Sequence, residues 1–172
     1  PYDVYRMTTG MGKSMQELLA ASVELNVVDG VILPNLKMQG TEEACAYLDE
    51  EGRCSIHPYR PGICRLFPLG RYYENGGFSY FLQTGECAKE NRSKIKVSKW
   101  IDTPDLTRNQ QFTLQWHDLL HAMEERLTGE DEGKQREENL LLLRLFYLLP
   151  YEGTIDFYTQ FTERMEHWNG QI

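Results

Sequence analysis

The segment HPYRPGICRLFPLG at residues 57–70 constrains the fold of this chain more than any other feature. Its three prolines remove three backbone donors and bias each preceding residue toward extended conformations. This composition predicts an irregular segment without a regular helix or a central strand. Arg60 and Arg65 lie on either side of Cys64, and nearby positive charge favours the thiolate form of a cysteine. The segment therefore predicts a sulfur atom in an electropositive setting.

The chain has four cysteines, and 8, 9 and 22 residues separate them: Cys45, Cys54, Cys64 and Cys87. Zinc and cubane iron–sulfur sites both need four converging thiolates. Arg53, Arg60 and Arg65 would offset the negative charge of such a site. The spacing alone does not decide between three hypotheses: metal ligation, buried or free thiols, and two disulfides in a secreted protein. A chain of 172 residues can fold without disulfides, so the last hypothesis is the weakest.

Charge and hydropathy exclude several classes of partner. The formal charge is −8, from 18 basic and 26 acidic residues, whereas a nucleic-acid backbone requires a concentrated basic surface. The basic segment at residues 89–99 is short, and we interpret it as a solvated connector. No apolar run approaches the roughly 20 residues of a membrane span. The first residues carry no signal-peptide pattern. We therefore expect a cytoplasmic protein that binds neither nucleic acid nor membrane.

The first half of the chain predicts short helices and hairpins. A capping-box sequence at Ser14 predicts a helix over residues 14–24, after a short helix that ends near Gly10. Residues 27–33 up to Pro34 predict a strand or a small hairpin. Two further hairpins are predicted, from residues 44–48 with 53–56 and from residues 71–74 with 78–82 around Asn75-Gly76-Gly77. The last hairpin is rich in aromatic side chains, which we expect to pack across its strands: Tyr72, Tyr73, Phe78, Tyr80 and Phe81.

The second half predicts helices. Apolar residues at three- and four-residue steps predict helices over 108–127, 137–149 and 154–168, with a mobile polar loop over 128–136. Together these elements predict an α+β fold with two parts. The expected parts are an irregular cysteine-rich metal-binding module with short hairpins at residues 1–100 and a three-helix region at residues 101–172 that packs on it.

His117 and His121 lie four residues apart on one predicted helix, a spacing that can bind zinc. No matching acidic helix accompanies them, which favours a solvated helix edge. His57 is the one histidine inside the cysteine region, and we consider it as an accessory ligand.

The string ACAYLDEEGRCSIHPYRPGICRLFP at residues 44–68 resembles the YkgJ-type cysteine-cluster family, which is described as zinc- or iron-chelating. The family pattern contains a glycine turn, G-[KR]-C-S-I and [HY]-x-x-R-P-x-x-C-R-x-F-P, and nearly every element is present. Members usually begin with C-x-x-C-x-x-C-C and then P-x-D-[VI]-x-R-[LM]. Residues 1–7 are similar to the second of these motifs, so we expect the hallmark cysteines just before Pro1. The resemblance covers residues 1 to about 95.

The resemblance implies a ligand set and a cofactor. The cysteines that match the family's downstream ligands are Cys45, Cys54, Cys64 and Cys87. Eight cysteines in total would suit two four-thiolate centres. With Arg60 and Arg65 near the cofactor, this total favours an iron–sulfur cluster, of the 4Fe–4S type, and zinc is the alternative. The expected role is redox or structural. Many relatives have tyrosine at the position of His57, which favours packing there over ligation.

Flagellin lysine N-methylase belongs to the same family, so a protein-modifying methyltransferase is the alternative function. The residues offer little for it, because no G-x-G-x-x-G nucleotide loop is present. Gly10-Met11-Gly12-Lys13-Ser14 is interpreted as a turn between helices. No nucleophile and base can be paired, so no catalytic residue is predicted. An unknown protein partner is compatible with either function.

Overall fold

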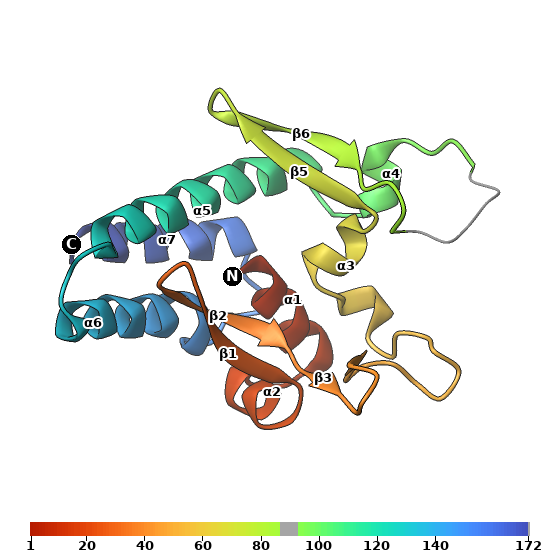
Figure 1. The fold of residues 1–172 in the computed structure, drawn as a ribbon, viewed down its shortest axis with the longest axis horizontal. Helices are drawn as coiled ribbons and strands as arrows, with labels where there is room; N and C mark the ends of the chain where they lie inside the picture. The colour runs from red at the N-terminus through yellow and green to blue at the C-terminus, as the bar shows by residue number, and fades with distance from the viewer. Residues whose placement is uncertain (87–92, 172) are drawn as a thin grey trace. The chain divides into compact units, whose positions relative to one another are not determined.

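The computed structural model describes residues 1–86 and 93–171 (Figure 1). The chain forms two compact units, Pro1–Arg60 with Leu120–Ile172, and Pro61–Leu119. Helices and two-stranded antiparallel hairpins make up both units, which confirms the predicted α+β class. The sequence predicted a metal-binding module at residues 1–100, and that boundary stays a prediction because the two units are a division by packing alone. None of the helices among the described residues combines the length and the apolar composition that crossing a bilayer requires.

The first unit begins with the two predicted helices. Helix α1 spans Tyr2–Met11 and ends at Gly12, whose φ of 65° is a left-handed conformation that glycine adopts without steric cost. Helix α2 spans Met15–Ala21 and begins with the predicted capping box. The Ser14 hydroxyl accepts from the Glu17 amide, and the Glu17 carboxylate accepts from the Ser14 amide at 2.7 Å. The predicted α2 is thus confirmed, three residues shorter at its C-terminal end.

Strands β1 (Val23–Val28) and β2 (Val31–Leu36) form the first predicted hairpin, around Asp29-Gly30. Both turn residues have positive φ, as a type I′ turn requires. The prediction that Pro34 ends the strand is wrong, since β2 continues through it to Leu36. Pairs alternate along a hairpin, and Pro34 lies opposite Leu25 in a non-hydrogen-bonded pair, where its missing N–H costs the ladder nothing.

The predicted hairpin of residues 44–48 with 53–56 is mostly wrong. Strand β4 (Ala44–Cys45) pairs instead with β3 (Met38–Gln39). Only the bridge between Leu48 and Cys54 remains of the expected ladder in this part of the chain. Polar and glycine residues dominate here, and they lack the β-branched side chains that stabilise longer strands.

The C-terminal helices of the first unit differ from the prediction in their boundaries. Helix α5 spans Leu106–Leu127, and its last turns belong to this unit. The expected loop at 128–136 is wrong from Glu132 onward, because Asp131 accepts from two amides and starts α6 at Glu132–Leu143. The expected helix end near Leu149 is a π-helix, η2 (Arg144–Leu148). Helix α7 spans Phe157–Asn169, as predicted within three residues.

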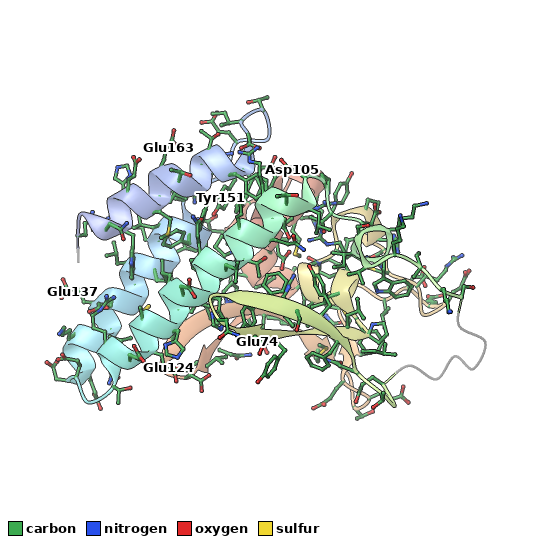
Figure 2. The ribbon with its side chains drawn as sticks, turned by 90° about the horizontal axis from the view of Figure 1, so that it is seen from above. Glu74, Asp105, Glu124, Glu137, Tyr151 and Glu163 are labelled. Carbon is green, nitrogen blue, oxygen red and sulfur yellow. The ribbon has the colours of Figure 1, made fainter. Side chains whose placement is uncertain are left out.

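The core of the first unit lies among these helices. Its most deeply buried side chains come from distant parts of the chain: Leu18, Met123, Leu142 and Phe146. Figure 2 shows Glu137 and Glu163 on the outer sides of α6 and α7, and both are exposed. Asn139 is buried and ties α6 to the first hairpin, since its amide donates to Gly30 O and accepts from Ile32 N.

The proline-rich segment of residues 57–70 runs from the end of one unit into the start of the other, and the prediction that it holds no regular helix is wrong. A 3-10 helix, η1 (His57–Tyr59), closes the first unit, and α3 (Gly62–Leu66) opens the second. Pro58 lies in the first turn of η1 and Pro61 is the N-cap of α3, so at both positions the missing N–H has no helical partner anyway. The third predicted hairpin is confirmed as β5 (Leu69–Glu74) and β6 (Gly77–Leu82). Helix α4 (Val97–Ile101) was not predicted.

Candidate metal centre

The first two candidate ligands, Cys45 and Cys54, lie at the two ends of a short irregular loop of the first unit. Cys45 ends β4, and its carbonyl accepts from the Leu48 amide at 3.0 Å. Cys54 lies opposite Leu48 in the isolated bridge. Both cysteines are half-buried and take part in no disulfide. The backbone therefore places the two thiols at the two ends of one loop, and the prediction that they ligate one metal stays a prediction.

Asp49 organises the loop between these two cysteines. Its carboxylate Oδ1 accepts from the amides of Glu51 at 3.0 Å and Arg53 at 2.8 Å, and its own amide donates to Arg53 O at 2.9 Å. An aspartate that bonds to amides further along its own chain is a common way to close a turn. Gly52 completes the turn with a φ of 72°.

The segment after Cys54 is anchored to the body of the first unit. Ile56 is buried, and the Ser55 hydroxyl donates to Tyr47 O at 2.9 Å. Tyr47 is itself buried, and its hydroxyl hydrogen-bonds to that of Ser22. The loop that carries the cysteines is therefore attached at both ends, although most of its side chains are exposed.

A third anchor joins η1 to α1, some fifty residues away in the sequence. The Arg6 guanidinium donates to Pro58 O. The ring of Tyr59 lies over Gly10, so closely that a Cβ on Gly10 would be 2.1 Å from the ring Cδ1. The sequence interpretation missed this contact. A glycine inside a helical pattern is the signal that could have found it, because such a glycine often marks a close approach.

Cys64 lies in the second unit, on the exposed side of α3. The next residue, Arg65, is 4 % exposed, and its Nη1 donates to the Thr103 hydroxyl at 2.9 Å. Arg65 and Cys64 thus differ sharply in exposure, and the guanidinium joins α3 to the segment after α4. The predicted role of Arg65 beside a cofactor stays a prediction.

The other arginines of the region lie in the first unit. Arg53 is exposed and forms ion pairs with Glu51 and, at 3.5 Å, with Asp49. Arg60 is half-buried. Two carboxylates therefore offset the charge of Arg53 next to Cys54, and its predicted part in balancing the charge of a metal site stays a prediction.

Cys87 lies outside the described residues. Within the described ranges, no three side chains of the metal-ligating types form a group that could hold an ion. His57 is exposed. His117 stacks on Tyr73 with a centroid distance of 3.8 Å, and His121 lies 3.5 Å from Glu125. The two histidines therefore have separate neighbours, and the predicted solvated edge holds only in part.

The family model of a cysteine domain matches residues 12–112, which is more than half of the chain. The chain belongs to the CxxCxxCC family. The family carries the description "Putative zinc- or iron-chelating domain". The comparisons with curated proteins and with solved structures found no match.

Membership of the CxxCxxCC family confirms the resemblance that residues 44–68 indicated. All four cysteines lie inside the matched range, and so do α3, the β5–β6 hairpin and α4. All of α1, and the helices that follow residue 112, lie outside it. The zinc- or iron-chelating description therefore applies to the part of the chain that holds the thiols.

Proposed function

We propose that this protein binds an iron–sulfur cluster through Cys45, Cys54, Cys64 and Cys87, and that the cluster has a redox or structural role. The observation that carries the proposal is the position of all four cysteines inside the matched zinc- or iron-chelating domain. Thiolates are soft ligands that suit iron–sulfur clusters and zinc, and they suit magnesium or calcium poorly.

The surroundings of the cysteines support a cluster over a single zinc ion. Arg53, Arg60 and Arg65 accompany three of the cysteines in the sequence. A four-thiolate cluster carries net negative charge, and nearby positive charge and hydrogen bonds to sulfur tune its potential. The half-buried thiols Cys45 and Cys54 are also shielded in part from solvent, and solvent exposure is one of the factors that set the potential of such a cluster.

The test is anaerobic purification of the full-length protein, followed by quantification of iron, acid-labile sulfide and zinc. We expect iron and sulfide in equal amounts, a visible absorption band near 400 nm, and loss of both in each single Cys→Ser variant. His57→Ala is the matched control and should keep the metal. Zinc without sulfide would overturn the iron–sulfur assignment, and metal retained in all four Cys→Ser variants would overturn the ligand set.

The role of the cluster can be tested separately. A redox cluster changes its electron paramagnetic resonance signal reversibly when dithionite and then an oxidant are added. A structural cluster instead leaves the signal unchanged over the accessible range, and its removal unfolds the cysteine loop.

A further inference from the structure

The second unit carries an exposed surface in which apolar and basic side chains meet beside Cys64. We define the α3–α4 face by its apolar members Ile63, Phe67, Val97 and Trp100 and by its lysines Lys94, Lys96 and Lys99. From this face we propose that the protein docks an acidic protein segment that carries apolar side chains. The proposal goes beyond metal binding and does not depend on it.

The apolar members of the α3–α4 face are exposed to solvent. Ile63 is 68 % exposed, Phe67 45 % and Trp100 41 %. Ile63 and Phe67 are four residues apart, so they lie on the same side of α3, and Val97 and Trp100 are three apart on α4. Scattered apolar residues on a surface are ordinary, whereas a contiguous group of large ones marks an interaction site.

The two helices hold these side chains in place. Helices α3 and α4 pack against each other (Figure 1). The indole Nε1 of Trp100 donates to Phe67 O at 3.0 Å, and the buried Arg65 bonds to Thr103 on the opposite side. Ile101, next to Trp100, is only 2 % exposed. Helix α4 therefore has a buried residue, Ile101, that fixes it to the unit and an exposed residue, Trp100, whose indole is held by a hydrogen bond.

Charge identifies the class of partner. Residues 93–101 contain three lysines and no acidic residue, in a chain whose net charge is −8. All three lysines are exposed. A local positive surface on an acidic protein attracts negatively charged partners and steers their approach. An apolar centre with a charged rim is the usual composition of a small transient interface. An acidic segment with Phe or Leu side chains complements both features.

Other occupants are less complementary. A nucleic acid would meet three lysines but also the repulsion of the remaining acidic surface. A second copy of this chain could supply acidic groups, since 26 of its residues are Asp or Glu. Both alternatives are outcomes of the experiment below.

The experiment titrates the full-length protein, purified anaerobically, into a synthetic peptide in which Asp and Glu alternate with Phe and Leu. A red-emitting dye on the peptide reports binding by fluorescence anisotropy, away from the absorption of an iron–sulfur cluster. We expect saturable binding that weakens with added salt. A peptide with Lys in place of the acidic residues, and one with Ser in place of the apolar residues, should each bind about tenfold more weakly or not at all.

Two pairs of variants locate the site. The triple reversal Lys94→Glu, Lys96→Glu and Lys99→Glu should weaken binding about tenfold or more. The matched control reverses Lys13, Lys134 and Arg136 to Glu, which are exposed and lie in the first unit. Each triple change moves the formal charge from −8 to −14, because every reversal removes one positive and adds one negative charge. The control should bind the peptide as the unchanged protein does.

The second pair tests the apolar part. Ile63→Ser should weaken binding, whereas Val27→Ser, at a residue of the first unit with similar exposure, should not. Both side chains are more than two thirds exposed, so both variants should fold. Four results would each overturn the proposal. They are equal binding of the peptide by both triple variants, equal binding of the apolar and Ser peptides by the protein, tighter binding of single-stranded DNA than of the peptide, and dimer formation that competes with the peptide. None of these outcomes depends on which metal is bound.

Discussion

The ring of Tyr59 occupies the space where a side chain on Gly10 would begin. A Cβ at Gly10 would lie 2.1 Å from Cδ1 and 2.6 Å from Cγ of that ring. Contact with Cγ, the root of the ring, means that the clash cannot be relieved by moving the tip of the side chain alone. The pair therefore sets the distance between α1 and η1, the 3-10 helix that follows Cys54.

We predict that Gly10→Ala displaces η1 from α1 and weakens metal retention at Cys54. Tyr59 is 37 % exposed, so moving it costs less than unfolding α1, whose helix gains stability from alanine. The expected loss of stability is about 1–2 kcal/mol, at the low end of overpacking. The measurements are the rate of metal transfer to a chelator and the unfolding midpoint of the metal-free protein.

Two further variants control this experiment. Gly153→Ala adds a Cβ 3.5 Å from Thr9, which is an ordinary van der Waals distance, and it should change neither measurement. In the double variant Gly10→Ala with Tyr59→Ala, the clash is gone, so Gly10→Ala should add no further metal loss. Additive effects of the two substitutions would show that the ring and the glycine act independently.

We predict a large loss of stability for Arg164→Met. The guanidinium donates to three carbonyls at the end of η2, those of Leu145, Leu149 and Pro150, at 2.7–3.0 Å. It also lies over the ring of Tyr151, 3.6 Å from its centroid. Tyr151 is one of the side chains that Figure 2 labels. Methionine would fill the space but leave one buried and two part-buried carbonyls without a donor, which costs roughly 3 kcal/mol.

Urea denaturation measures this effect. The free energy of unfolding of Arg164→Lys should lie between those of the unchanged protein and Arg164→Met, because an ammonium reaches fewer carbonyls than a guanidinium and does not stack on Tyr151. The neighbouring exposed substitution Glu163→Gln is the control and should stay within about 0.5 kcal/mol of the unchanged protein. A small effect of Arg164→Met would mean that water satisfies the carbonyls at the end of η2.

We predict that Glu17 makes the first unit sensitive to acid. Hydrogen bonds from the Ser14 amide and hydroxyl hold the pKa of the Glu17 carboxyl below its ordinary value of 4.5. A pKa lowered by folding contributes stability above the ordinary value, and this contribution is lost as the pH falls through the folded pKa. The difference in unfolding free energy between the unchanged protein and Glu17→Gln should therefore shrink below about pH 4.5.

Thermal unfolding between neutral and acidic pH checks this prediction. Ser14→Ala removes the hydroxyl donor, so the pKa of Glu17 should rise toward its ordinary value. The pH range over which the protein loses stability should then rise with it. A constant difference between Glu17→Gln and the unchanged protein at every pH would show that the carboxylate contributes nothing through its charge.

We predict that removing the metal opens the cysteine loop of residues 45–54. This loop has little regular structure and mostly exposed side chains, so its order depends on the anchors at its ends. Metal binding supplies folding free energy to such segments. After chelation, trypsin should cut after Arg53 about tenfold faster, as the opened population rises. Mass spectrometry identifies the cut, and equal rates with and without metal would contradict the prediction.

Local chemistry explains which elements could be predicted. The capping box at Ser14, the Asp29-Gly30 and Asn75-Gly76 turns and the apolar spacing of α5 and α7 depend on residues that are neighbours in the sequence. Two boundaries failed for local reasons as well. The expected strand end at Pro34 is wrong because proline is harmless in a non-hydrogen-bonded pair, and the expected loop is wrong where its polar residues begin α6.

The cysteine pattern of residues 44–68, through its resemblance, was enough to identify the domain family, and the four thiols as its ligands stay a prediction. Tertiary structure decided how these thiols are held: Arg6 and Gly10 support the segment after Cys54, Arg65 bonds to Thr103 behind Cys64, and Arg164 caps the end of η2. The physical reason is distance along the chain. Each of these contacts joins residues some twenty to fifty positions apart, and several join an arginine to a backbone carbonyl. Contacts of this kind leave no periodic signal in a single sequence.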